Sequence, residues 1–223
     1  MNLLLFAVAP VFIIILYIYF KDKYEKEPKR LLVYNFLLGA IVSIIVTTIL
    51  YYIINVFIPL PNETSVFQQF IKAFFVVGLT EEFSKYIIVR YYAQTNKEFD
   101  EPFDGIVYAV MVSMGFAATE NIFYVLEGGY QTALLRAFTA VPAHATFGIL
   151  MGYYMGKAKF SNNKILLNLT GLLLAASFHG AYDFFLFIDF IPGIWLGAFV
   201  SLIVGIVLSR KAIKRHQQRS KFK

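Results

Sequence analysis

Long apolar stretches recur along nearly the whole of this 223-residue chain, and only short polar breaks separate them. A helix needs about 20 mostly apolar residues to cross the ~30 Å hydrocarbon core of a bilayer. Only 15% of the residues are charged, against roughly 25% in soluble domains. We therefore expect an all-α, polytopic transmembrane helix bundle with about seven spans. The expected spans are 3–20, 31–58, 67–92, 105–126, 132–156, 165–187 and 190–208.

These spans leave no room for a separate soluble domain. We expect one membrane-embedded domain over residues 1–209, followed by a basic cytoplasmic tail over residues 210–223. The polar break at residues 188–192 is short, and it is either an outer loop between the last two spans or a re-entrant bend. The chain has no cysteine. Disulfides, thiolate nucleophiles and cysteine-ligated zinc are therefore excluded.

The basic residues predict the orientation of the chain, because short cytoplasmic loops carry an excess of Lys and Arg. Every Lys and Arg except Lys72, Lys85 and Arg136 lies at the break after the first, third, fifth or seventh span. We therefore expect the N-terminus outside and the C-terminus in the cytoplasm. Topology also accounts for the formal net charge of +6. The expected surroundings are the lipid bilayer, and no nucleic-acid partner is expected.

Several ionisable side chains lie within four consecutive expected spans, where each costs roughly 2.5–3.5 kcal/mol at the helix centre. Such groups usually face the bundle interior and pair with one another. Glu81 and Lys85 are four residues apart, as are His179 and Asp183, so each pair shares one helix face. We therefore expect one polar functional site. Its expected ionisable members are Glu81, Glu82, Lys85, Glu120, His144, His179 and Asp183.

The expected depth of this site follows from the helix rise. At ~1.5 Å per residue from the outer ends of the spans, these side chains lie roughly 5–20 Å below the outer surface. Pro142 removes a backbone hydrogen bond and is expected to kink the fifth span beside His144, which would open space for water. Gly148, Gly152 and Gly156 form a ridge of small residues on the same span and predict close helix packing.

Such a set of residues is suited to hydrolysis or to proton movement. A desolvated carboxylate can take a proton from water, while a histidine or a metal stabilises the oxyanion that forms. The same groups can also bind and move protons. The chain has no His-Glu-x-x-His zinc motif and no Gly-x-Ser-x-Gly nucleophile turn. Glutamate-based hydrolysis and an unusual metal site are the remaining hydrolytic mechanisms.

Four short motifs follow one another on successive spans. They are Glu81-Glu82-Phe-Ser-Lys85, Phe116-Ala-Ala-Thr-Glu120-Asn121, Pro142-Ala-His144-Ala and His179-Gly-Ala-Tyr-Asp183. Their order and placement resemble the PrsW family of membrane proteases, which are distantly similar to CAAX-type prenyl endopeptidases and bacteriocin-immunity proteins. The resemblance extends from the first span to about residue 187.

The resemblance implies site-1 proteolysis of a single-span anti-sigma factor near its extracytoplasmic boundary, by a multi-pass protein in the plasma membrane of a Gram-positive bacterium. It implies that Glu81 or Glu82 is the general base and that Lys85 tunes this carboxylate. His179 would support the oxyanion or bind a metal. Asp183 would orient the imidazole of His179.

The chain also departs from the related prenyl endopeptidases, which carry a histidine where this sequence has Glu120. Glu120, His144 and His179 are together a candidate zinc site, because carboxylate and imidazole suit that metal. Phe116 and Asn121 belong to the second motif and are expected to support the site. The competing hypothesis is a proton-coupled transporter or ion-binding membrane protein that uses the same cluster. Against it, the chain is short and shows no inverted repeat.

Overall fold

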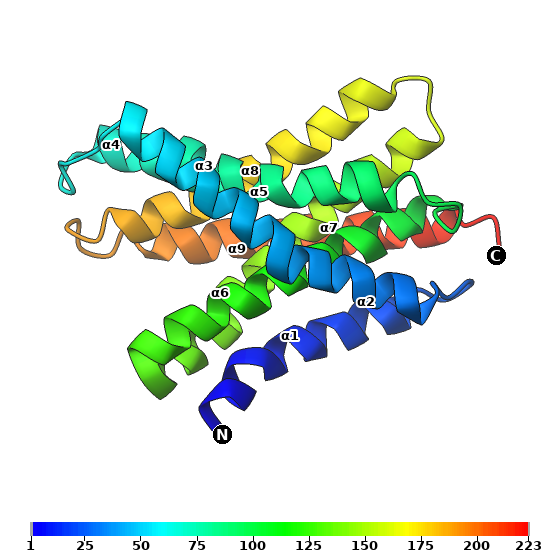
Figure 1. The fold of residues 1–223 in the computed structure, drawn as a ribbon, viewed down its shortest axis with the longest axis horizontal. Helices are drawn as coiled ribbons and strands as arrows, with labels where there is room; N and C mark the ends of the chain where they lie inside the picture. Colours follow the sequence, from blue (N-terminus) through cyan, green and yellow to red (C-terminus); the bar gives the residue numbers. More distant parts are fainter. Residues whose placement is uncertain (1, 223) are drawn as a thin grey trace.

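The computed structural model describes residues 2–222, which form helices and connecting turns without a β-strand. The expected all-α bundle is confirmed. The helices run between the two ends of an elongated molecule (Figure 1). They are α1 (Asn2–Lys21), α2 (Lys29–Leu38), α3 (Ile44–Phe57), α4 (Val66–Ile71), α5 (Leu79–Ile88), α6 (Pro102–Phe138), α7 (Ala140–Lys159), α8 (Lys164–Phe187) and α9 (Leu196–Gln218), with π-helical segments η1 (Gly39–Ser43), η2 (Lys72–Gly78) and η3 (Val89–Ala93).

Five helical stretches of the described chain are long and apolar enough to cross a membrane, whereas the sequence predicts seven passes. One of the five contains both α6 and α7, which pack against each other as a hairpin. The continuous helical run over residues 66–93 carries five charged side chains, so its composition is too polar for it to be among them. The five stretches are Leu3–Lys21, Lys29–Phe57, Pro102–Lys159, Lys164–Phe187 and Leu196–Gln218.

The glycine ridge on α7 packs against α6, and these two helices form the most extensive helix contact of the described chain. A methyl group at Gly152 would collide with the backbone of Gly105, and one at Gly156 would collide with the backbone of Pro102. Gly148 lies against α6 further along the same face. Small residues let two helix backbones approach this closely. The prediction of close packing at this ridge is confirmed.

The chain reverses at the break expected at residues 127–131. Gly129 adopts a positive φ of 68° there, and Arg136 comes back beside Glu120 and Asn121. A second break follows at Thr139, and α7 begins at Ala140. The expected kink at Pro142 is therefore wrong. This proline lies in the first turn of α7, where its missing N–H would have no partner within the helix.

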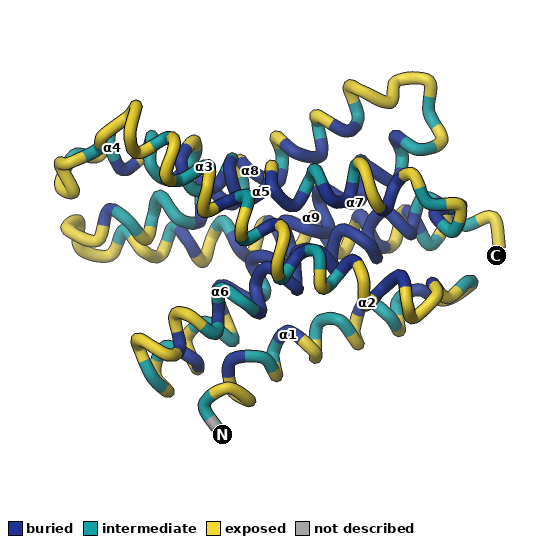
Figure 2. The backbone as a smooth tube through the Cα atoms, in the orientation of Figure 1, coloured by how far each residue is buried: buried dark blue, intermediate teal, exposed yellow. Residues whose placement is uncertain are grey.

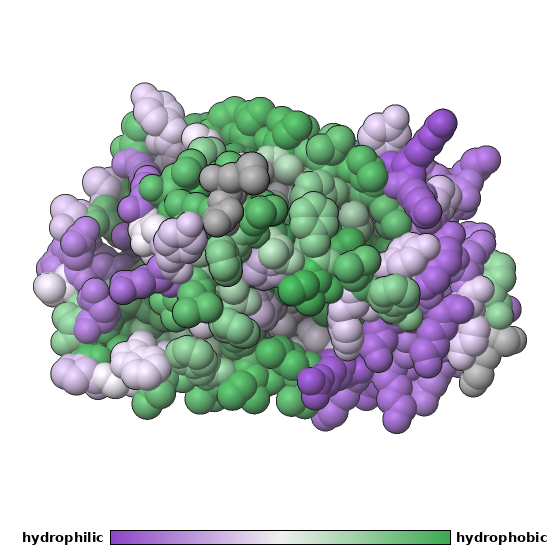
Figure 3. Space-filling view, turned by 90° about the horizontal axis from the view of Figure 1, so that it is seen from below, coloured by the Kyte–Doolittle hydropathy of each residue, from purple (hydrophilic) through white to green (hydrophobic). Residues whose placement is uncertain are grey.

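Polar residues gather at the two ends of the molecule, and hydrophobic residues cover its middle (Figure 3). The buried segments concentrate in the centre, mainly on α6 and α7 (Figure 2). The first turn of α1 and the last turn of α9 lie toward opposite ends (Figure 1). The helix α9 continues to Gln218, so most of the expected tail over residues 210–223 is helical.

The last two helices are separate. Helix α8 ends at Phe187 and α9 begins at Leu196, with Gly193 at a positive φ of 79° between them. This positive φ favours glycine. The connecting turn lies at the end of the molecule opposite the C-terminus (Figure 1).

At the end that holds the C-terminus, the loop between α1 and α2 buries an acidic side chain against α6. Glu27 is only 5% exposed, and its carboxyl group faces that of Asp104. Burial, followed by repulsion from Asp104, raises the pKa of Glu27 well above its usual range. The ionised form of Glu27 therefore opposes folding at this position.

Replacing Glu27 by Gln should raise the midpoint of thermal unfolding more at pH 8 than at pH 5. The folded-state pKa lies above the unfolded value of about 4.3. Stability associated with this group is therefore fully present below the unfolded pKa and is lost as the pH rises toward the folded pKa. We expect a gain on the order of 3 °C at pH 8. Exposed Glu63→Gln is the matched control, and equal gains at both pH values would contradict this account.

Candidate active site

The helix that carries the first motif is irregular on both sides of it. Glu81, Glu82 and Lys85 lie on α5, between the π-helical segments η2 and η3. Such wide turns are rare in proteins and occur frequently at functional sites. Gly78, at the end of η2, lies against the backbone of Gly180 on α8. This close approach brings the glutamates of α5 next to the fourth motif.

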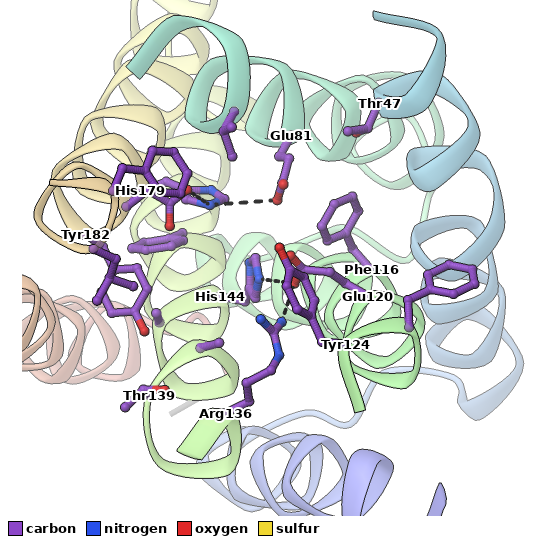
Figure 4. Close-up of a pocket in the computed structure, with 18 of the residues that line it drawn as sticks. Thr47, Glu81, Phe116, Glu120, Tyr124, Arg136, Thr139, His144, His179 and Tyr182 are labelled. Atoms are coloured by element: carbon purple, nitrogen blue, oxygen red, sulfur yellow. Dashed lines mark hydrogen bonds and ion pairs between the residues drawn. The ribbon is translucent and has the colours of Figure 1, made fainter. Parts of the chain in front are cut away.

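A cavity of about 640 Å³ lies between α3, α5, α6, α7 and α8. Glu81, Glu120, His144 and His179 project toward it from four different helices (Figure 4). Glu82 does not line the cavity and lies behind its wall. The titratable and hydroxyl side chains that line the cavity are Thr47, Thr48, Tyr51, Lys72, Glu81, Glu120, Tyr124, Thr132, Arg136, Thr139, His144, His179, Tyr182 and Asp183.

Glu82 is fully buried and holds two other members of the cluster. Its Oε1 accepts a hydrogen bond from Nζ of Lys85 at 2.6 Å and lies 3.0 Å from Nδ1 of His179. Lys85 is only 1% exposed. A buried charge without a partner costs several kcal/mol, so the carboxylate of Glu82 and the ammonium of Lys85 each stabilise the other. Glu82 thus fixes Lys85 and His179 from behind the cavity wall.

Glu81 faces the cavity and has one carboxylate oxygen without a hydrogen-bond partner. The hydroxyl of Tyr51 donates a hydrogen bond to Oε1 of Glu81 at 2.7 Å. Oε2 lies 3.6 Å from Nζ of Lys85 and 3.8 Å from Nε2 of His179, and it forms no hydrogen bond with the described residues. A buried polar atom in this situation marks a place for a water, a proton or a metal ion.

His144 is held through both of its ring nitrogens. Nε2 lies 2.8 Å from Oε2 of Glu120, which also accepts a hydrogen bond from Nη2 of Arg136 at 2.8 Å. Nδ1 lies 3.3 Å from Nζ of Lys85. A carboxylate that accepts an imidazole N–H fixes the tautomer and orientation of the ring. Glu120 therefore holds His144, and Arg136 holds Glu120.

The imidazole of His179 lies between two carboxylates. Nε2 lies 3.3 Å from Oδ2 of Asp183, while Glu82 contacts Nδ1. A neutral imidazole has one N–H, so it can donate to only one of them. The ring also stacks on Phe147, with centroids 4.8 Å apart and planes inclined by 19°. The sequence spacing indicates the contact with Asp183 and gives no sign of the contact with Glu82.

The two other residues of the second motif support the site from different sides. Nζ of Lys85 lies 4.1 Å from the ring centroid of Phe116, a cation–π contact. Asn121 is buried and does not line the cavity. Its Nδ2 donates to the backbone oxygen of Ala7 and its Oδ1 accepts from Nε of Arg136, both at 2.6 Å. Asn121 thus connects α1 to the arginine that holds Glu120.

Three residues of the cluster form a group that could hold a metal ion. Ligand atoms of Glu81, His144 and His179 all lie within 4.8 Å of one another. This group shares both histidines with the set expected from the sequence and has Glu81 in place of Glu120. The cluster contains four carboxylates and two permanent cations; ion pairs join the cations to Glu81, Glu82 and Glu120, and Asp183 contacts His179. With neutral histidines, two negative charges are in excess, and one divalent cation would balance them.

Two residues of the site are absent from the sequence-based set of site residues. Tyr51 contacts Glu81 from α3, and a signal for it exists, because Ser43, Thr47 and Tyr51 form a polar stripe at four-residue spacing in an apolar span. Arg136 is an ionisable residue in an expected span, and from the charge distribution it stands out only as one of three basic residues away from the cytoplasmic breaks.

Comparison with known proteins assigns the chain to a family. Residues 27–210 match a family described as PrsW family intramembrane metalloprotease. Over 187 residues the chain is 42% identical to Protease PrsW of Oceanobacillus iheyensis, with 83% of each chain covered. It is 39% identical to Protease PrsW of Geobacillus kaustophilus, which covers 87% of this chain and 84% of that protein. No solved structure matches the chain.

A third relative is Protease PrsW of Bacillus subtilis, which is 36% identical over 182 residues, with 81% of this chain and 80% of that protein covered. The resemblance inferred from the four motifs is thereby confirmed. Between the two classes of function considered from the sequence, the comparisons favour the membrane protease over the transporter. This chain belongs to the PrsW family of intramembrane metalloproteases.

Proposed function

We propose that this protein makes the site-1 cleavage of a single-span anti-sigma factor, close to the extracytoplasmic membrane boundary of that substrate. The sigma factor is released after further cleavage. The relatives come from Bacillus-like bacteria, which supports the plasma membrane of a Gram-positive bacterium as the location. With the C-terminus in the cytoplasm, the end of the cavity lined by Lys72 and Phe187 lies toward the outer side. This placement supports cleavage near the outer boundary.

The observation that carries the hydrolytic assignment is the position of Glu81. It is the one carboxylate of the described residues that both lines the cavity and has a buried oxygen without a hydrogen-bond partner. A water beside Oε2 can give a proton to this oxygen as it attacks the scissile carbonyl carbon. The same proton can then pass to the leaving amine. Glu82 is tied to Lys85 and His179, so we assign it the supporting role.

A divalent cation also fits this position, because bound by Glu81, His144 and His179 it would satisfy the free oxygen of Glu81 and balance the excess negative charge. Oε2 of Glu81 would then ligate the metal instead of taking the proton of the water. We propose zinc, since carboxylate oxygen and imidazole nitrogen are its usual ligands in catalytic sites. When bound, zinc would supply Lewis acidity and increase the acidity of a bound water. Glu120 would then hold His144 through Nε2, and Glu82 would hold His179 through Nδ1. Nδ1 of His144 and Nε2 of His179 would ligate the metal in place of their contacts with Lys85 and Asp183.

The substrate has to enter the cavity in a conformation that exposes the peptide bond to be cut. A peptide bond within a helix is protected by its own hydrogen bonds, so the substrate has to present an extended segment to the cavity. Extended chain is found more readily at the membrane boundary of a single-span protein than at the centre of its span. Apolar and aromatic lining residues, such as Phe123 and Leu186, accompany the polar groups and suit a segment that is leaving the bilayer.

Replacing Glu81 or Glu82 by Gln should abolish proteolysis for two different reasons. Glu81→Gln removes the carboxylate that takes the proton of the water or, with a metal bound, ligates that metal, so we expect a loss of about 10²–10⁴-fold with little change in the folding of the protein. Glu82→Gln removes the anion that neutralises Lys85, so we also expect a loss of stability of up to about 3 kcal/mol. Cleavage of a tagged single-span anti-sigma factor by purified protein measures the activity, and thermal unfolding measures the stability.

Exposed Glu127→Gln, near the end of the cavity-lining part of α6, is the control and should retain wild-type cleavage. If Glu81→Gln cleaves at the wild-type rate, the role of Glu81 is wrong. If Glu82→Gln keeps the wild-type stability, its supporting role is wrong.

The position of the cut tests the proposed side of the membrane. We expect the new N-terminus of the membrane-retained substrate fragment to lie within a few residues of the outer boundary of its span. The reason is that Lys72 and Phe187, which line the cavity, lie at the start of η2 and the end of α8, toward the end of the protein opposite the C-terminus (Figure 1). Mass spectrometry of this fragment locates the cut. A cut on the cytoplasmic side, or at the middle of the span, would rule out this placement of the site.

A further inference from the structure

Helix α5, which carries Glu81 and Glu82, is joined to η1 and α3 by hydrogen bonds between hydroxyl side chains. Ser43 and Ser84 share a hydrogen bond of 2.6 Å between their Oγ atoms, and Oγ1 of Thr47 donates to Oγ of Ser84 at 2.9 Å. Ser84 in turn donates to the backbone oxygen of Glu81 at 2.8 Å. Ser43 is fully buried and Thr47 is 4% exposed. These contacts set the position of α3 relative to the backbone of Glu81.

Tyr51 is one further helical step along the same face of α3. Its hydroxyl reaches into the cavity and donates to Oε1 of Glu81 at 2.7 Å. The adjacent Tyr52 points away and is 74% exposed on the membrane-facing surface. Two neighbouring tyrosines therefore differ in their contact with the site.

The contact with Tyr51 settles the orientation of the Glu81 carboxylate. The terminal torsion of a glutamate is broad, so the plane of its carboxylate is not fixed by the side chain itself. Among the described residues, only the hydroxyl of Tyr51 donates a hydrogen bond to this carboxylate. With Oε1 held in this way, Oε2 is left on the side of His179.

We propose that Tyr51 is a positioning residue that fixes the Glu81 carboxylate so that Oε2 is directed at the histidine pair, where the water or metal of the reaction is bound. This inference rests on the proposed role of Glu81 in hydrolysis. Tyr51 acts through Glu81 and has no separate part in substrate binding. Its loss therefore lowers the rate of the chemical step and leaves substrate affinity unchanged.

The test compares Tyr51→Phe with Tyr52→Phe in the purified full-length protein. Each variant loses one hydroxyl, and only the first loses a contact with Glu81. For Tyr51→Phe we expect kcat to fall about 10–100-fold, as for other partners that orient ligands or catalytic groups, while KM stays within about twofold. Titration with Co²⁺, followed by its visible absorption, should show affinity weakened by about 10–100-fold. Tyr52→Phe should match the wild type in all three measurements.

Thermal unfolding separates positioning from a general loss of structure. Thr47→Val keeps the side-chain shape and removes a hydroxyl contact between α3 and α5, so it reports the effect of loosening the hydroxyl contacts alone. If Tyr51→Phe keeps kcat within twofold of the wild type, raises only KM, or loses activity only in parallel with thermal stability, the inference is overturned. If Glu81→Gln is itself active, the proposed function has failed first. An inactive Glu81→Gln with a fully active Tyr51→Phe overturns the inference alone.

Discussion

The buried ion pair between Glu82 and Lys85 is the contact on which the rest of the site depends. Nζ of Lys85 lies 2.6 Å from Oε1 of Glu82, and neither residue is more than 1% exposed. Either charge alone would cost several kcal/mol at this position. Because Glu82 also contacts His179 and Lys85 also contacts His144, the pair connects α5 to both α8 and α7. The two histidines are thereby held against each other and close to the Glu81 carboxylate.

The site repeats one arrangement twice. Glu120 contacts Nε2 of His144, and Glu82 contacts Nδ1 of His179, so each imidazole is held by a glutamate from another helix. The ring centroids lie 5.3 Å apart. A carboxylate partner of this kind sets the tautomer of a histidine that ligates a metal or stabilises an anion. The four motifs therefore supply two histidines, two glutamates that orient them, and the cavity-lining Glu81, whose Oε2 has no hydrogen-bond partner among the described residues.

Much of this could be predicted from the sequence, because hydrophobic length and four-residue spacing are local properties. The apolar stretches predict a helical membrane protein, and the pairs Glu81/Lys85 and His179/Asp183 indicate shared helix faces. The different positions of Glu81 and Glu82, one facing the cavity and one behind its wall, could not be predicted. Adjacent residues point about 100° apart on a helix, and which of the two faces the cavity depends on the packing of α5 against α3 and α8. The contact from Tyr51 is equally non-local.

Metal analysis of the purified protein tests the central claim most directly. We propose that a divalent cation held by Glu81, His144 and His179 balances the excess negative charge of the cluster. The account predicts one equivalent of zinc, or of another divalent transition metal, in wild-type protein purified without chelator. It predicts loss of that metal in Glu81→Gln and its retention in Glu127→Gln. A fully active wild-type preparation that contains no stoichiometric metal would contradict it.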